Sequence, residues 1–255
     1  MSGSSIKVPP IDGDFWVLKL LTTAGGEALS DYLAGRSVVL AGVVGLALLG
    51  LGAAVQLRAR SYQPVPYWLF AAAIAVFGTM LADGMHVVAG IPYPVTSTLY
   101  AVALAVVFLL WHRATGSIDI HTVTAGRPEL YYWCAVGAAF ALGTALGDFA
   151  AFSLGLGYLA SALLFGVLFA AALLLHHRAR WGATVTFWSA YVLTRPFGAS
   201  VADYLGKPHG HGGGLGWGDG AVALGLFAAF ALMLIRVAIR YDGVARPVGS
   251  TDESA

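Results

Sequence analysis

The sequence predicts an all-α polytopic membrane protein of about eight transmembrane helices, arranged as four parallel two-helix repeats around a pseudo-fourfold or pseudo-twofold axis. Three observations lead to this fold class. Of the 255 residues, 58% are hydrophobic and only 11% are charged, whereas soluble proteins average about 25% charged residues. The apolar residues form eight runs long enough to cross a bilayer. One motif recurs four times at matching places in these runs.

Charged residues and Gly- or Pro-rich breaks divide the chain into the predicted spans. The spans cover residues 15–33, 37–57, 66–86, 95–112, 130–150, 157–176, 184–205 and 220–239. The first span is not a cleaved signal peptide, because it contains Lys19, Glu27 and Asp31. No connecting segment is long enough for a soluble domain. Residues 1–255 are therefore expected to form a single transmembrane domain, with flexible cytoplasmic tails at 1–12 and 244–255.

Basic residues predict the orientation of the chain. In membrane proteins, the loops richer in Lys and Arg face the cytoplasm. Here Lys and Arg gather on the side of the two termini, and only Arg36 and Lys207 lie in loops on the other side. We therefore expect a multi-pass protein with both termini in the cytoplasm and the lipid bilayer as its surroundings.

The repeated motif is aromatic-Trp-x9-Gly-x4-Asp, and each copy lies in an odd-numbered span. The four copies start at Phe15, Tyr67, Tyr132 and Phe187, pass through Gly26, Gly78, Gly143 and Gly198, and end at Asp31, Asp83, Asp148 and Asp203. Each copy is followed by a plain apolar span, which gives units at approximately 15–60, 66–113, 130–180 and 186–240. Two spans per unit make all four units enter the membrane in the same direction. We expect the motif glycines at helix contacts and the motif tryptophans at the membrane interface.

Three segments carry a resemblance to a known family. They read FWVLKLLTTAGGEALSDYL, YYWCAVGAAFALGTALGDFAA and FWSAYVLTRPFGASVADYL. Together they resemble small bacterial repeat proteins that are described as uncharacterised membrane-anchored proteins, and the resemblance covers nearly the whole chain. It implies a protein of the bacterial inner membrane with internal repeats. It implies no established activity, so the functional argument must come from the residues.

Ionisable residues gather on one face of the odd-numbered spans. On a helical wheel the motif aspartates share this face with Lys19, Glu27 and Arg195. Acids at membrane depth are costly and usually face a bundle interior or a watery cavity. Five acids stand there against two basic residues: Glu27, Asp31, Asp83, Asp148 and Asp203 against Lys19 and Arg195. An interior with this excess of negative charge needs cations, protons or both.

Nearby hydroxyls complete a set of oxygen ligands for hard cations. They belong to Thr22, Thr23, Ser30, Thr79 and Thr144. The sequence therefore predicts transport of cations through a pathway lined by the repeated aspartates, with Glu27 one turn deeper. The cation is a proton or a divalent metal such as Mn²⁺, Mg²⁺ or Ca²⁺. We expect no covalent cofactor, and a divalent cation could be bound. Anion transport is disfavoured.

Other functions remain open at this point. The aspartates could simply cap the turns that follow them, and the protein could be a non-transporting membrane sensor or interaction partner. An intramembrane enzyme is disfavoured because the chain contains no nucleophile elbow, phosphate loop or His-Glu-x-x-His motif. The single cysteine, Cys134, excludes a disulfide framework. We expect no nucleic-acid partner.

Two basic residues lie within the predicted spans. Arg195 precedes Pro196 and needs an acidic partner such as Glu27 or Asp31, in a pair that serves either as a gate or as a structural clamp. Lys19 lies one turn from Trp16, and we expect its ammonium to extend to the cytoplasmic surface.

Histidines and one glycine-rich span add further candidates. His86, His209 and His211 are secondary candidates for metal ligands, although the last two lie in a glycine-rich loop that could be a plain connector. A homodimer could form through Gly42, Gly45, Gly50 and Gly52 of the second span.

Overall fold

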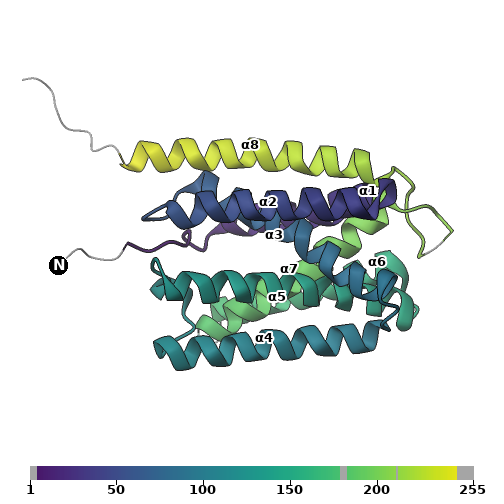
Figure 1. The fold of residues 1–255 in the computed structure, drawn as a ribbon, viewed down its shortest axis with the longest axis horizontal. Helices are drawn as coiled ribbons and strands as arrows, with labels where there is room; N and C mark the ends of the chain where they lie inside the picture. The colour runs from purple at the N-terminus through teal and green to yellow at the C-terminus, as the bar shows by residue number, and fades with distance from the viewer. Residues whose placement is uncertain (1–4, 179–182, 211, 246–255) are drawn as a thin grey trace, which may run out of the picture.

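The computed structural model describes residues 5–178, 183–210 and 212–245, and this part of the chain forms a bundle of eight α-helices (Figure 1). The helices are α1 (Gly13–Arg36), α2 (Val38–Arg58), α3 (Pro64–Asp83), α4 (Tyr93–Thr115), α5 (Arg127–Asp148), α6 (Gly157–Arg178), α7 (Ala183–Gly206) and α8 (Asp219–Ala245). Two π-helical turns, η1 (Gly84–Val88) and η3 (Phe149–Ser153), continue α3 and α5, and a 3₁₀ turn, η2 (Ile120–Thr122), precedes α5. Each predicted span corresponds to one observed helix.

Local sequence explains where several helices begin and end. The side chain of Asp12 accepts a hydrogen bond from the Phe15 amide at 2.9 Å and caps α1. Ser37 separates α1 from α2 and caps the second helix in the same way. Prolines stand in the first turn of α3, α4 and α5, where a missing amide hydrogen costs nothing. Gly116 ends α4 in the left-handed conformation, with φ of 78°.

Six of the helices are long and apolar enough to cross a membrane: α2, α3 with η1, α4, α5 with η3, α6 and α8. This finding indicates a membrane protein. The other two helices, α1 and α7, are of similar length. They carry most of the interior charges, among them Lys19 and Glu27 on α1 and Arg195 on α7.

The odd-numbered helices form the interior of the bundle. Helix α1 packs against α3 and α7, and α5 packs against the same two helices. Each even-numbered helix lies outside: α2 packs on α3, α4 on α5, α6 on α7 and α8 on α1. In the apolar stretches of α3 and α5, about two-thirds of the residues are buried. The buried share is only 11% in α2 and 22% in α4 and α8. The described chain starts and ends at the same end of the bundle (Figure 1).

The motif glycines allow the four inner helices to approach closely. A Cβ atom added to any of them would lie within 2.8 Å of a side-chain carbon on the neighbouring inner helix. Gly26 faces Ala75, Gly78 faces Phe140, Gly143 faces Arg195 and Gly198 faces Thr23. The facing residue stands in every case three positions before the next motif glycine. The prediction that these glycines are helix-contact positions is confirmed.

Residues 5–12 differ from the flexible tail that the sequence predicted over 1–12. The ammonium of Lys7 lies 2.7 Å from the carboxylate of Glu129 and donates to the carbonyl oxygen of Gln56 at 3.0 Å, and all three residues are buried. The backbone of Ile6 and Lys7 also bonds to Tyr62 and Val123. The segment thus ties the α2–α3 and α4–α5 connections together. Of the tail expected over 244–255, residues 244 and 245 continue α8, and the rest lies outside the described residues.

Candidate functional site: an acid-lined cavity among four helices

Interior side chains of α1, α3, α5 and α7 form layers, because every fourth residue of each helix points to the same side. Five layers follow from the repeat. The aromatic layer is Phe15, Tyr67, Tyr132 and Phe187; the lysine layer is Lys19, Ala71, Val136 and Tyr191; the arginine layer is Thr23, Ala75, Phe140 and Arg195; the glutamate layer is Glu27, Thr79, Thr144 and Ala199; the aspartate layer is Asp31, Asp83, Asp148 and Asp203. Every residue of the first four layers is at most 4% exposed.

The glutamate and arginine layers are joined by one buried ion pair. Nη2 of Arg195 lies 2.7 Å from Oε2 of Glu27, one of the two partners that the sequence predicted. The hydroxyls of Thr79 and Thr144 accept from Arg195 and donate to Glu27, at 3.0 Å and 3.4 Å for the two donated bonds. Arg195 also donates to the carbonyl oxygen of Thr23 at 2.9 Å. The pair therefore contacts all four inner helices.

The aspartate layer lines a cavity of about 490 Å³. All four motif aspartates and Glu27 border it, so the structure brings the five acids of the predicted pathway together. Asp31 and Asp203 come from the last turns of α1 and α7, whereas Asp83 and Asp148 end α3 and α5. A π-helical turn follows each of the latter two at once, a rare distortion that often occurs at functional sites.

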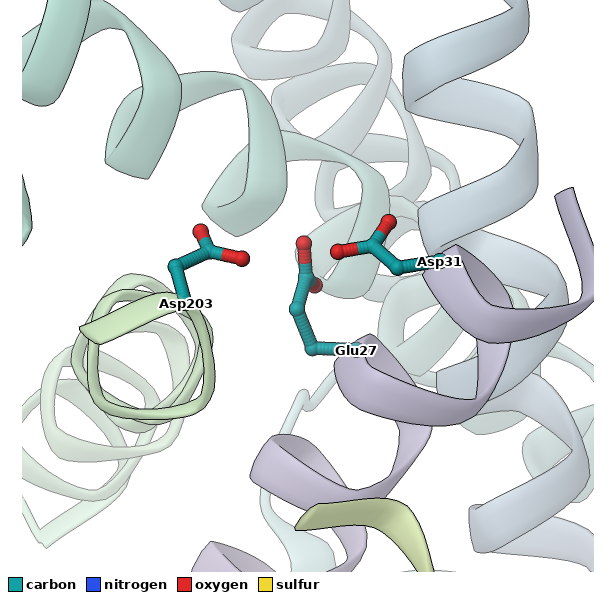
Figure 2. Close-up of side chains that lie close together, drawn as sticks. All are labelled: Glu27, Asp31 and Asp203. Atoms are coloured by element: carbon teal, nitrogen blue, oxygen red, sulfur yellow. The ribbon is translucent and has the colours of Figure 1, made fainter. Parts of the chain in front are cut away.

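Partners of the carboxylates in this cavity are few. Asp31 lies 2.6 Å from the ammonium of Lys207, which also pairs with Asp219 at 3.3 Å. The side chains of Asp83, Asp148 and Asp203 make no hydrogen bond or ion pair with any described residue. Carboxylate oxygens of Glu27, Asp31 and Asp203 all lie within 4.8 Å of one another (Figure 2). The cavity therefore keeps the excess of acidic over basic side chains that the sequence predicted.

Lys207 is a fixed positive charge beside these acids. Partial burial lowers the pKa of Lys207, but the carboxylates of Asp31 and Asp203 raise it by more, so the net pKa lies above its ordinary value. The ammonium is thus protonated at neutral pH. From the sequence, Lys207 was expected only as one of two basic residues in the loops on the side opposite the termini. Its position four residues after Asp203, one helical turn, is the signal that could have associated it with the acids.

Other residues of the cavity were also missed or left without a role. Tyr93, Tyr158 and Asp219 line it, and none was predicted as a site residue. Among the predicted hydroxyls, those of Thr22 and Thr23 donate to the backbone carbonyl of Lys19 and not to an acid. Ser30 lines the cavity, is fully buried, and its hydroxyl has no hydrogen-bond partner.

The expected surface position of Lys19 is wrong. Its side chain is 1% exposed, and its ammonium has no hydrogen-bond partner. The ammonium instead lies 3.7 Å from the ring centre of Phe140 and 4.1 Å from that of Tyr191. Lys19 points into the bundle because α1 is an inner helix, and the aromatic layer one turn away blocks the route to that end of the bundle.

The tryptophans also differ from expectation. Trp68, Trp133 and Trp188 are at most 7% exposed and pack among the aromatic rings of the inner helices, whereas interfacial anchors would be exposed to lipid headgroups. Trp16 alone is half-buried. The motif pair aromatic-Trp thus builds an internal aromatic cluster.

Neither His86 nor His209 lines the cavity. Nδ1 of His86 lies 2.8 Å from the carbonyl oxygen of Ile91, and its ring stacks on Tyr93 at 3.7 Å, so it holds the turn after η1. His209 is exposed in the α7–α8 loop. His211 lies outside the described residues.

Fold and cavity together define a class of protein: an all-helical bundle with six helices able to cross a membrane and an acid-lined cavity among its inner helices. The chain belongs to the family described as Repeat of Unknown Function (DUF347), whose repeat matches residues 66–117, 131–181 and 186–240. These segments coincide with the second, third and fourth predicted units, so the internal repetition is confirmed. No curated protein and no solved structure matches the chain.

Proposed function

We propose that the protein moves cations, either a divalent metal or protons, across the bacterial inner membrane through a pathway lined by the repeated aspartates. The observation that carries this proposal is the cavity in which Glu27 and four aspartates meet. The side chains of three of those aspartates form no hydrogen bond and no ion pair with any described residue. Ionised carboxylates that are half-buried or buried without partners require a cation or a proton nearby.

In the proposed arrangement α1 and α7 cross the membrane with the other six helices. The four units stand parallel around a pseudo-fourfold axis, with both termini in the cytoplasm. Two observations support this arrangement. Each motif glycine faces the equivalent position of the next unit in cyclic order. Residues of one layer also contact each other: Phe15 with Phe187, Tyr67 with Tyr132, and Glu27 with the hydroxyls of its own layer.

The pathway is closed toward the termini in this conformation. Between the glutamate layer and the end of the bundle where the described chain begins, the axis is filled by the arginine, lysine and aromatic layers. The residues of these three layers are all buried. Transport therefore requires these layers to separate. The Glu27–Arg195 pair is the proposed gate, since it joins all four inner helices and must break or shift as they part.

The same closed layers favour a second function, a non-transporting sensor that binds a cation in the cavity. The described residues of the arginine, lysine and aromatic layers are all buried, and a receptor needs no opening past the glutamate layer. The two functions differ in one measurable quantity, the flux of cations across a membrane that contains the protein.

Flux in liposomes tests the proposal. The full chain is reconstituted, and entry of Mn²⁺, Ca²⁺ or protons is followed with internal dyes. Asp148→Asn removes one unpaired charge with almost no change of shape and should reduce flux about tenfold or more. Asp242→Asn makes the same chemical change at an exposed site of α8 and should leave flux unchanged. Equal flux in the two folded variants, or no flux in the unaltered protein, would exclude transport through this cavity.

A homodimer through α2 belongs to the same proposal. Gly45 and Gly52 pack against α3, whereas Gly42 and Gly50 have no described atom near the place of a Cβ. Gly42 also lines the acid-lined cavity, whereas Gly50 is exposed and lets a second copy approach the backbone of α2 closely. Crosslinking in membranes would detect it.

A further inference from the structure

Three of the five acids in the cavity form a closer group between α1 and α7. Figure 2 shows Asp31 and Asp203 pointing toward Glu27 from two sides. One carboxylate oxygen of each lies within 4.8 Å of the others. On Glu27, the bonds from Arg195, Thr79 and Thr144 all fall on Oε2, which leaves Oε1 for another partner.

A buried hydroxyl in the lining of the same cavity points independently to a ligand. Ser30 is 0% exposed and lines the same cavity, and its Oγ has no hydrogen-bond partner. Buried hydroxyls in folded proteins nearly always have a partner. A hydroxyl oxygen of a residue that lines the same cavity as three carboxylates is a suitable further ligand for a hard cation.

The spacing of the oxygens fits a single metal ion. Two ligands on opposite sides of one ion are separated by twice the bond length, which is about 4.6–5.2 Å for Ca²⁺ and about 4.0–4.2 Å for Mg²⁺. Mutual distances of up to 4.8 Å accommodate an ion of the size of Ca²⁺ as the side chains stand. A smaller ion requires the carboxylates to approach by a few tenths of an ångström.

Charge favours a divalent ion over a monovalent one. Glu27, Asp31 and Asp203 carry three negative charges when ionised, and Arg195 cancels one of them at 2.7 Å. Two negative charges remain. A divalent ion neutralises both of them, whereas the single charge of the Lys207 ammonium neutralises only one. Asp83 and Asp148 border the same cavity and make its potential more negative.

We propose that Glu27, Asp31, Asp203 and Ser30 bind one divalent cation, and that the ammonium of Lys207 competes with this cation for Asp31. The proposal specifies the cation class and the binding residues of the proposed function, on which it rests for its role in transport. Binding itself is measurable without transport.

Lys207 is placed to act as a tethered competitor. Its ammonium lies 2.6 Å from Oδ2 of Asp31 and 3.3 Å from Oδ2 of Asp219, and its side chain is 27% exposed. When a cation takes Asp31, Lys207 keeps Asp219 as its partner. Removing the Lys207 charge should therefore strengthen cation binding, whereas removing a ligand should weaken it.

Equilibrium binding to the purified, metal-free full chain tests the site. Mn²⁺ is titrated and counted by the loss of its free electron paramagnetic resonance signal, with Ca²⁺, Mg²⁺ and Na⁺ as competitors. We expect one bound Mn²⁺ per chain, displaced by Ca²⁺ and not by Na⁺. Asp203→Asn should weaken binding about tenfold or more, and Ser30→Ala severalfold. Lys207→Met should strengthen binding about threefold to tenfold.

Asp148→Asn is the matched control, because Asp148 lines the same cavity outside the close group. Its effect should be clearly smaller than that of Asp203→Asn. Equal weakening by the two variants would show that the cavity as a whole, and not the close group, attracts the cation. Unchanged or weaker binding in Lys207→Met would show that Lys207 does not compete with the cation. If Asp203→Asn does not fold, Ser30→Ala and Lys207→Met decide.

The failure of this site and the failure of transport give different results. Stoichiometric Mn²⁺ binding with the expected variants but without flux in liposomes upholds the site and excludes transport. Flux that depends on Asp148 in a protein without stoichiometric binding overturns the site and upholds the pathway.

Discussion

The guanidinium of Arg195 lies 2.7 Å from the carboxylate of Glu27, and both residues stand where the second and third units have neutral residues. Glu27 stands where the second and third units have Thr79 and Thr144. Arg195 stands where those units have Ala75 and Phe140. The first and fourth units thus diverged in complementary ways. Because α1 packs against α7, their pair joins the two ends of the repeated chain.

Arg195→Met should destabilise the protein strongly. The change leaves Glu27 buried without its counter-charge, which costs about 3–5 kcal/mol in the free energy of unfolding. The double variant Glu27→Gln/Arg195→Met removes both charges and should recover part of the loss. Unfolding in detergent, followed by circular dichroism, measures both. Arg240→Met is the control, since its pair with Asp14 is exposed and contributes under about 1 kcal/mol. A double variant as unstable as the single one would contradict the prediction.

Gly143→Ala should loosen the contact between α5 and α7. The added methyl group would overlap the side chain of Arg195 and lie 2.9 Å from Cδ of Pro196. Overpacking of this kind costs about 1–3 kcal/mol. Gly137→Ala in the same helix is the matched control, because its nearest neighbour, Cγ2 of Ile74, is 4.0 Å away. That variant should gain up to about 1 kcal/mol from helix propensity. Melting temperatures that move in the same direction would refute the role of Gly143.

The helices and the shared acidic face could be predicted from the sequence. Span length, prolines and the regular motif locate each helix, and a glycine and an aspartate five residues apart in every odd span indicate one contact face. The face that a helix turns to lipid is as apolar as a packed core, so hydropathy does not separate inside from outside. For this reason the burial of Lys19 and of three motif tryptophans was not predicted.

Residues that join the site from loops or from other helices were harder to predict. Lys207 and Asp219 flank the α7–α8 connection, and only their tertiary position brings them to Asp31. Lys7 was counted as a topological charge, yet its partner Glu129 is distant in the sequence. Such pairings depend on how the helices pack, which no local pattern specifies.

Lys7→Met should destabilise the end of the bundle at which the described chain begins and ends. The side chain of Glu129 would remain buried with only Gln56 and Trp133 as donors, at 3.0 Å and 3.4 Å. The loss of its ion pair should lower the free energy of unfolding by about 3–5 kcal/mol. Thermal melting in detergent measures the effect. Arg58→Met, an exposed change at the same end of α2, should fall within about 0.5 kcal/mol of the unaltered protein. Equal melting of the two variants would show that residues 5–12 do not hold the connections.

Lys19→Met should make the protein more stable. The ammonium of Lys19 has no hydrogen-bond partner and forms no ion pair with a described residue. Its contacts with the rings of Phe140 and Tyr191 offset only part of the cost of burial. Methionine has a similar shape and brings no polar atom that needs a partner. We expect a gain of about 1–3 kcal/mol.

Unfolding in detergent compares Lys19→Met with Arg36→Met, whose exposed side chain lies at the end of the same helix and should matter little. A loss of stability in Lys19→Met would mean that contact with the two rings stabilises the folded protein by more than burial of the ammonium destabilises it. A gain would mean that the lysine is retained at the expense of stability. Residues of that kind concentrate at functional sites, because stability alone would select against them. Lys19 would then join Glu27 and Arg195 as a third ionisable side chain in the buried layers of the inner helices.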